Sequence, residues 1–319
     1  MKIVFMGTPD FSVGTLEEIV AAGHEVACVV TQPDKPRGRG KEMQPTPVKV
    51  AALQHELPVY QPKRVRDPEA VEKIRSYEPD VIVVVAFGQI IPQQILDIPR
   101  YGCINVHASL LPKYRGAAPI QWAVLDGEKV SGVTIMRMDA GLDTGDMIAK
   151  VEVPLDESET AGTLFDKLST AGAKLLVQTL PSLADGTAVY EKQPEESPTP
   201  YARMIKKQDG EINWARSAEE IERWIRGMSP WPSAYTHLGN KTLKIWTAKA
   251  EEGQKNCAPG TVLEAGKEGL VVSAGHGALR LLEIQLEGKK RMEAEAFLRG
   301  FSIERGTVLG SVKEQEEQV

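Results

Sequence analysis

The chain has 319 residues and a formal net charge of -6, with 26% of its residues charged. This length is sufficient for two domains, each with its own hydrophobic core. The acidic balance excludes a generally basic nucleic-acid binder, so any contact with RNA must be local.

The first part of the chain alternates predicted strands with predicted helices. Apolar strands are predicted at 2–6, 25–31 and 80–86, and a helix at 12–22 separates the first two. The turn that begins at Gly7 lacks the further glycines of a dinucleotide fingerprint, so NAD is not expected to bind there. Strands and helices in this order predict an α/β domain with a Rossmann-like, mostly parallel sheet.

A long loop rich in proline, glycine and charge spans residues 32–47. Connections inside α/β units usually have about two to six residues, so this one is unusual. It carries Arg37, Arg39 and Lys41. The loop is either a solvated surface segment or a flexible cationic finger that contacts phosphates.

Polar residues gather near the end of a short apolar strand over 103–106. Asn105 and His107 are two residues apart, so they share one side of that strand. A second predicted strand starts at Gly132 and runs into an acidic, glycine-rich turn that contains Asp143, whose carboxylate could meet the imidazole. In an α/β sheet, the crevice for a ligand lies at the carboxyl ends of the strands.

Two loops next to these strands favour a binding site. The loop over 87–92 follows the strand over 80–86, and its backbone polar groups could face a ligand. The loop Ser109-Leu110-Leu111-Pro112 is apolar where a surface loop would be polar, and loops carry function more often than packing.

Competing interpretations of His107 are a packed or solvated side chain, a serine hydrolase and a metal site. Ser109 is poorly placed for a Ser-His pair, because the two residues are joined by a tight strand turn. One histidine and one carboxylate leave a metal shell incomplete, so no metal is expected.

The second part of the chain changes character after a predicted long helix within 160–183. The proline- and glutamate-rich segment around 195–200 predicts an extended linker. We expect a first domain at 1–189, a linker at 190–208 and a second domain at 209–319. Short strands between glycine-containing turns predict a small β-barrel in the second domain.

Neither the cysteines nor the apolar runs indicate secretion or membrane insertion. Cys28, Cys103 and Cys257 lack paired spacing, so no disulfide framework or zinc site is expected. No run reaches the roughly 18 apolar residues of a membrane span. We therefore expect a soluble cytoplasmic protein with no membrane partner.

The chain resembles the formyltransferases that use 10-formyltetrahydrofolate. The resemblance rests on Asn105-x-His107-x-Ser109-Leu110-Leu111-Pro112, on Arg115-Gly116 and on Gly132 followed by Asp143-x-Gly145. Other segments extend it over nearly the whole chain, most closely to the members that act on methionyl-tRNA. These segments are Met6-Gly7-Thr8-Pro9-Asp10-Phe11, Thr31-Gln32-Pro33-Asp34-Lys35-Pro36, Gly38-Arg39-Gly40-Lys41 and Ser229-Pro230-Trp231-Pro232.

The resemblance implies transfer of a formyl group from 10-formyltetrahydrofolate to the α-amine of initiator methionyl-tRNA, for translation initiation. Asn105 and a protonated His107 would donate hydrogen bonds to the oxyanion of the tetrahedral intermediate. His107 would also protonate the departing N10, and Asp143 would orient the ring and accept the amine proton.

The resemblance also implies the binding residues and partners. Ser109, Leu110, Leu111 and Pro112 would form a wall of the folate site. Arg37, Arg39 and Lys41 would engage the tRNA acceptor arm. The second domain would be an OB-like barrel that binds tRNA, and the enzyme is expected to act as a monomer.

Two other functions are weighed against this one. The acceptor could be a small amine, such as glycinamide ribonucleotide or an amino sugar, which would need neither the basic loop nor the barrel. The chain could also be a non-catalytic RNA-binding protein. The presence of Asn105, His107 and Asp143 argues against the second function.

Overall fold

The computed structural model describes residues 1–37, 42–253, 257–267 and 269–310. Two compact units emerge from the contacts along the chain. Residues 1–120, 129–155 and 164–203 form the first unit, and residues 121–128, 156–163 and those from 204 onward form the second.

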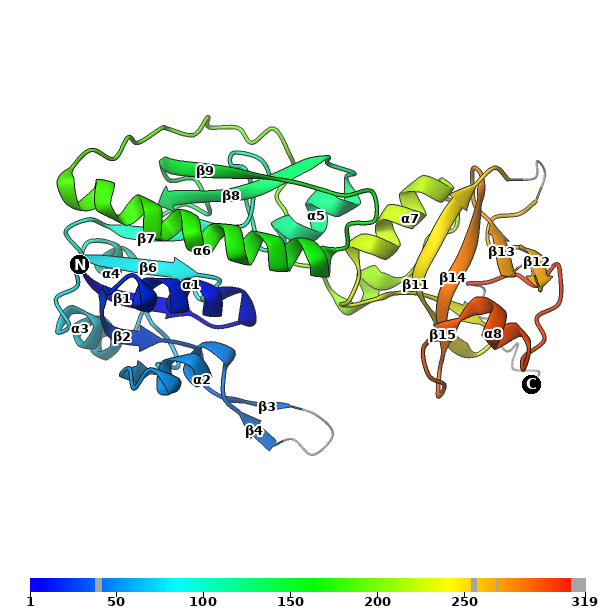
Figure 1. Ribbon diagram of the computed structural model, residues 1–319, viewed down its shortest axis with the longest axis horizontal. Helices are drawn as coiled ribbons and strands as arrows, with labels where there is room; N and C mark the ends of the chain where they lie inside the picture. Colours follow the sequence, from blue (N-terminus) through cyan, green and yellow to red (C-terminus); the bar gives the residue numbers. More distant parts are fainter. Residues whose placement is uncertain (38–41, 254–256, 268, 311–319) are drawn as a thin grey trace, which may run out of the picture. The chain divides into compact units, whose positions relative to one another are not determined.

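A seven-stranded sheet runs through the first unit in the order β5-β2-β1-β6-β7-β8-β9 (Figure 1). The first five strands in that order are parallel, whereas β8 and β9 are antiparallel to their neighbours. The predicted mostly parallel sheet is therefore confirmed. The strands are β1 (Lys2–Gly7), β2 (Glu25–Val30), β5 (Val59–Tyr60), β6 (Val81–Val85), β7 (Cys103–His107), β8 (Val130–Arg137) and β9 (Met147–Pro154).

Helices cover both faces of this sheet. α1 (Asp10–Ala21) and α6 (Ala161–Asp185) lie side by side on one face, where the rings of Phe11 and Phe165 meet at 5.2 Å (Figure 1). α6 comes so close to the strands that a Cβ at Gly172 would lie 2.8 Å from Val106. The other helices of this unit are α2 (Pro47–Gln54), α3 (Pro68–Arg75) and α4 (Gln93–Leu96), while α5 (Pro119–Leu125) extends into the second unit.

Alternation along β7 determines which residues face the site. Ile104 and Val106 point toward α6, so Cys103, Asn105 and His107 point to the opposite face. Cys103 packs there with Ile95 of α4 in a large apolar cluster. The sequence thus places two polar side chains on a face that is otherwise a hydrophobic core.

Two of the three cysteines should resist thiol reagents in the folded protein. Burial raises the pKa of the Cys103 thiol to about 12 and also raises the pKa of Cys28 above its ordinary value. The thiolate is the reactive form, so both thiols stay unreactive at pH 8, whereas Cys257 is only partly buried. Titration with a disulfide reagent should count one fast thiol in the native protein and three in urea. Rapid modification of two thiols under native conditions would contradict this assignment.

The second unit contains an antiparallel sheet in the order β10-β11-β14-β13-β12, with β15 paired to β14. Residues 306–310 bridge its two edges, because Gly306 N donates to Val262 O and Gly310 N donates to His237 O. This bridge closes the sheet, in agreement with the expected small barrel. The elements are β10 (Ala234–Leu238), β11 (Lys241–Glu251), β12 (Val262–Gly266), β13 (Gly269–Ser273), β14 (Ala278–Leu286), β15 (Met292–Glu293), η1 (Lys207–Gly210), α7 (Ala218–Gly227) and α8 (Ala294–Leu298).

Among the described residues, none of the helices has both the length and the apolar character needed to cross a membrane.

Candidate functional site

The site is built on the carboxyl end of β7. His107 pairs with Thr134 of β8 and Asn105 pairs with Met136, so all four side chains share one face of the sheet. The His107 side chain is only 6% exposed. Asn105 is half-buried, and its amide makes no hydrogen bond to any other described residue. The amide is therefore available to a ligand.

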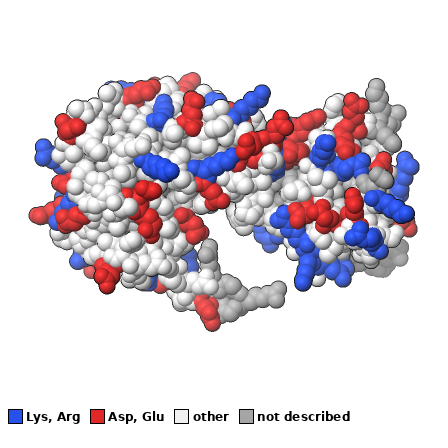
Figure 2. Space-filling view, in the orientation of Figure 1, with Lys and Arg blue, Asp and Glu red and all other residues white. Residues whose placement is uncertain are grey.

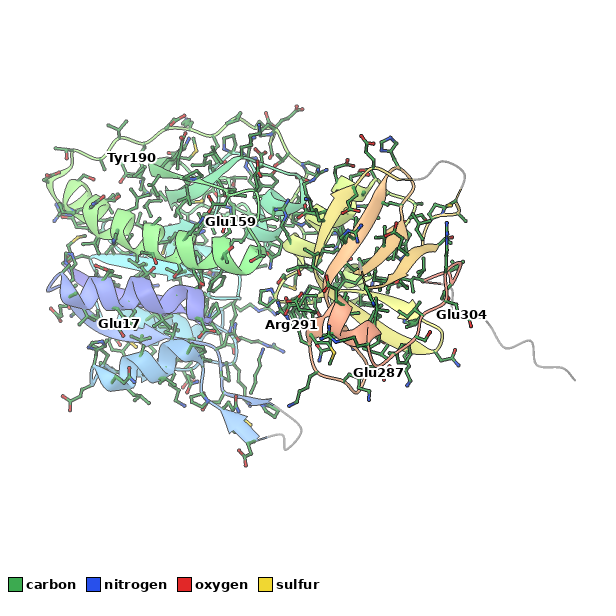
Figure 3. All side chains as sticks on the ribbon, turned by 45° about the vertical axis from the view of Figure 1, so that its right-hand side comes forward. Glu17, Glu159, Tyr190, Glu287, Arg291 and Glu304 are labelled. Atoms are coloured by element: carbon green, nitrogen blue, oxygen red, sulfur yellow. The ribbon has the colours of Figure 1, made fainter. Side chains whose placement is uncertain are left out.

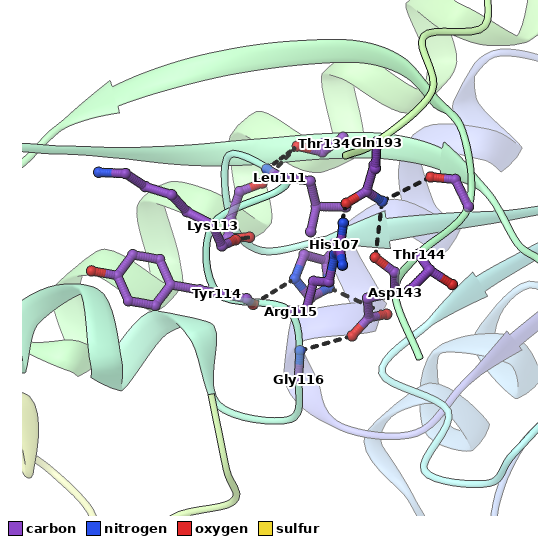
Figure 4. Close-up of polar contacts among 12 residues, drawn as sticks. His107, Leu111, Lys113, Tyr114, Arg115, Gly116, Thr134, Asp143, Thr144 and Gln193 are labelled. Carbon is purple, nitrogen blue, oxygen red and sulfur yellow. Dashed lines mark hydrogen bonds and ion pairs between the residues drawn. The ribbon is translucent and has the colours of Figure 1, made fainter. Parts of the chain in front are cut away.

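Asp143 reaches His107 from the loop that joins β8 to β9. Its Oδ1 lies 3.7 Å from His107 Nδ1, and its Oδ2 accepts a hydrogen bond from Gly116 N at 2.9 Å (Figure 4). The carboxylate is 23% exposed, so solvent or substrate can reach it. The structure thus brings together two side chains that are far apart in the sequence.

The neighbours of His107 fix the orientation of its ring. His107 Nε2 lies 3.1 Å from Tyr114 O, which can only accept, so Nε2 carries a hydrogen. His107 Nδ1 faces the carboxylate of Asp143. The 3.7 Å between Nδ1 and Oδ1 is an ion-pair distance and is longer than a hydrogen bond. The ring is held edge-on between a fixed carbonyl and a carboxylate.

Thr134, which the sequence analysis did not single out, fixes the loop over 109–112. Its hydroxyl donates to Ser109 O at 2.7 Å and accepts from Leu111 N at 3.0 Å. Ser109 is fully buried, and its own hydroxyl donates to Lys113 O. Leu111 packs against Met136 and Met147. A threonine in a strand is too common to signal such a role from sequence.

In the loop over 109–112, which the resemblance makes a wall of the folate site, two side chains are turned into the protein. Ser109 and Leu111 are covered by protein, and the Leu111-Pro112 peptide bond is cis. Leu111 lies behind Met136, which in turn lines a cleft beside Asp143. Through Met136, the Leu111 side chain adjoins this cleft.

This cleft has a volume of about 310 Å³ and lies between two loops. One loop, 88–91, follows β6, and the other, 138–143, follows β8 and ends at Asp143. Ile90 and Leu142 on its walls are 79% and 59% exposed. Their backbone N–H groups have no partner in the described part of the chain. The apolar walls and the backbone N–H groups suit a small molecule that has both apolar parts and hydrogen-bond acceptors.

The expected linker is extended, but residues 190–203, here called the strap, pack with the first unit. The strap begins near Tyr190, whose ring lies under the Arg137 guanidinium (Figure 3). Further along, Ser197 Oγ donates to Pro112 O at 2.9 Å and Thr199 Oγ1 accepts from Tyr114 N at 2.7 Å. The strap is thereby bonded to the loop that surrounds His107.

The basic loop forms an arm made of a two-stranded hairpin. Its strands are β3 (Lys35–Arg37) and β4 (Glu42–Gln44), and the backbone of Arg37 pairs with that of Glu42. The other two predicted tRNA contacts, Arg39 and Lys41, lie outside the described residues.

Comparisons with known proteins agree with this fold. The family described as "Formyl transferase" matches residues 1–180, and "Formyl transferase, C-terminal domain" matches residues 204–302.

Solved structures share the fold at low sequence identity. An N-formyltransferase from Helicobacter canadensis has a TM-score of 0.64 at 20% identity, with 88% of this chain and 99% of that chain covered. HypX from Aquifex aeolicus, solved with tetrahydrofolic acid, has a TM-score of 0.62 at 17% identity, with 96% and 50% covered. Together these findings define the class as formyl transferases.

Curated relatives narrow the class. The methionyl-tRNA formyltransferase of Agathobacter rectalis is 59% identical over 96% of this chain and 99% of its own length. That of Bacillus subtilis is 53% identical over 97% of this chain and 98% of its own length. The chain belongs to the methionyl-tRNA formyltransferase family.

Proposed function

We propose that this chain transfers the formyl group of 10-formyltetrahydrofolate to the α-amine of initiator methionyl-tRNA. The observation that carries the proposal is the His107–Asp143 pair at the end of a cleft that suits a small molecule. The family of the chain supports the same reaction. The described residues of this site all come from the first unit of one chain, so we further propose a monomeric enzyme. We also propose that it acts in the cytoplasm.

The proposed reaction begins when the amine nitrogen attacks the formyl carbon. A new N–C bond forms while the carbonyl electron pair moves to oxygen. Asn105, whose amide has no other partner among the described residues, donates to this oxyanion. Removing one such donor typically costs about 3–4 kcal/mol of transition-state stabilisation. Asn105 would act without moving, because β7 holds its backbone between two neighbouring strands.

In this transfer His107 would donate one proton and Asp143 would accept another. The oxyanion collapses to the formamide as the bond between N10 and the formyl carbon breaks. His107 then gives a proton to N10, and the attacking nitrogen loses its proton to Asp143. The partial exposure of Asp143 allows a water molecule to relay that proton. Both groups lie on the same side of the sheet as Asn105, so all three can face one carbon.

The cleft would bind the ring system of the folate. Its volume is within the range of small-molecule sites, which begins at about 300 Å³. Ile90 and Leu142 would cover the faces of the ring, and nearby backbone N–H groups would meet its edge. We propose that Ser109, Leu110, Leu111 and Pro112 form part of the wall of the folate site, where Leu111 packs against Met136 of the cleft.

The barrel would bind the tRNA. Figure 2 shows Lys and Arg side chains gathered over part of the second unit. Lys244 and Arg291 both lie over the ring of Trp246, at 5.6 and 4.6 Å from its centroid. A neighbouring pocket of about 530 Å³ is lined in part by Lys207, Lys244 and His237. Cations interleaved with aromatic rings are typical of nucleic-acid surfaces.

The arm would supply further phosphate contacts. Changing Arg37, Arg39 and Lys41 together to Ala should raise the KM for tRNA about tenfold or more, because each cation releases a counterion on binding. The salt dependence of log KM should also flatten by roughly two to three units of slope. The matched control replaces two exposed cations of α3, Lys73 and Arg75. Equal salt slopes for the arm variant and the wild type would contradict the proposal.

Isotope transfer tests the function itself. The chain is incubated with 10-formyltetrahydrofolate labelled in the formyl carbon and with methionyl-tRNA, glycinamide ribonucleotide and a nucleotide-linked amino sugar in parallel. Label on the methionyl-tRNA supports the proposal. Label only on a small amine would show that this amine, and not methionyl-tRNA, is the acceptor. No transfer to any of the three would overturn the proposed function.

A further inference from the structure

We propose that Gln193 is a positioning residue for Asp143, an inference that rests on the proposed role of Asp143 in formyl transfer. Gln193 belongs to the strap, and its Nε2 donates to Asp143 O at 2.9 Å and to Gly145 O at 2.8 Å (Figure 4). Both hydrogens of the amide therefore bind the backbone that carries the carboxylate. The strap fixes this part of the loop.

The backbone of Asp143 needs such a restraint. Its φ of 57° lies in the left-handed region, which non-glycine residues seldom adopt. This conformation aims Oδ1 at His107 and Oδ2 at Gly116 N. Rotation of the backbone into an ordinary region would turn the carboxylate away from both partners. The two carbonyls bound by Gln193 belong to Asp143 and Gly145, the residues on either side of Thr144. Rotation of the Asp143 backbone would break these hydrogen bonds, so they oppose it.

Arg115 fixes which way the Gln193 amide points. Its Nε donates to Gln193 Oε1 at 3.0 Å, and its other nitrogens donate to Pro194 O at 2.6 Å and Glu195 O at 3.1 Å. A flipped amide would set its NH₂ group against the guanidinium and its oxygen against two carbonyls. Such an arrangement has no acceptable hydrogen bond, so one orientation remains. Arg115 is 8% exposed, so its guanidinium is shielded from water, whereas Gln193 is only partly buried.

The chemistry of this position calls for an amide. A glutamate at 193 would keep the contact with Arg115 but would present only acceptors to the two carbonyls. A leucine would lose both contacts. Gln193→Glu thus separates the docking of the strap from the restraint on Asp143, and Gln193→Leu removes them together.

The test measures formyl transfer by the full-length Gln193→Glu variant. We expect kcat to fall about 10- to 100-fold, because a misplacement of about 1 Å can cost that much. The KM for the folate should change less than threefold, since Gln193 does not line the cleft. In an Asp143→Asn background the same change should lower kcat less than threefold, because the group that it positions no longer accepts a proton. The thermal midpoint should stay near that of the wild type.

Ser197→Ala is the matched control, because it removes a strap hydrogen bond to Pro112 O and leaves the Asp143 backbone untouched. Its kcat should stay within threefold of the wild type. A kcat for Gln193→Glu within threefold of the wild type, or equal fold losses with and without Asp143, would overturn the positioning role. If the wild type transfers no formyl group, the proposed function fails instead.

Discussion

A His107→Gln enzyme is expected to lose about three orders of magnitude in kcat, within the range for removal of a general acid or base. Glutamine can still donate a hydrogen bond toward Tyr114 O, so the surrounding loop keeps a partner. It cannot hold a proton on the side that faces Asp143 and cannot release one to N10. Single-turnover formyl transfer at saturating substrates measures the effect on the chemical step.

His55 provides the matched control, because it also pairs with a carboxylate. Its Nε2 lies 2.6 Å from Glu17 Oε2, but the pair is on the surface of the first unit. His55→Gln should leave kcat within twofold of the wild type. A His107→Gln enzyme that retains more than a tenth of the activity would show that the imidazole has no part in proton transfer.

The sequence predicts the parallel strands and the position of Asn105 and His107, because both follow from local alternation. β6 is a run of five buried residues, which only a strand covered on both faces can accommodate. The loop after it was expected to present backbone groups to a ligand, and it lines the cleft. In each case the relevant signal lies within a few residues of chain.

The strap could not be predicted because its partners are mostly backbone atoms. Arg115 donates to the carbonyls of Pro194 and Glu195, and every residue has a carbonyl. The proline- and glutamate-rich composition predicts an extended chain, which is correct locally. Composition carries no information about where an extended chain docks. The contacts of Gln193 with the Asp143 loop therefore could not be predicted from the sequence.

The role of the loop over 109–112 as a wall of the folate site, which the resemblance implies, stays a prediction. Apolar residues in a loop indicate that something covers them, and a ligand and the protein itself are equal candidates. The structure shows Leu111 packed against Met136. The folding of the β8–β9 loop over this face, which brings Asp143 to His107, depends on long-range contacts that no local pattern reports.

Replacing Gly145 with Ala should give the second large effect. A Cβ at this position would lie 1.8 Å from Arg137 O and 3.0 Å from Arg137 C. These are backbone atoms of a paired strand, so they cannot rotate away as a side chain would. The clash lies where Arg137 N donates to Asp146 O and closes the loop that carries Asp143. We expect a loss of about 1–3 kcal/mol in the free energy of unfolding, as for an overpacked core.

The loss of activity should exceed the loss of stability. Opening the loop displaces Asp143 from His107, so kcat should fall about 100-fold even where the protein remains folded. Gly141→Ala is expected to have a smaller effect. Its added Cβ would lie 2.0 Å from the Thr144 side chain, and that side chain can rotate away. Gly14→Ala in α1 meets only Ser169 Oγ at 3.6 Å and should be neutral or slightly stabilising. Urea unfolding and kcat measured on all three variants separate the two effects. A Gly145→Ala enzyme with normal kcat would mean that Asp143 does not depend on a closed β8–β9 loop.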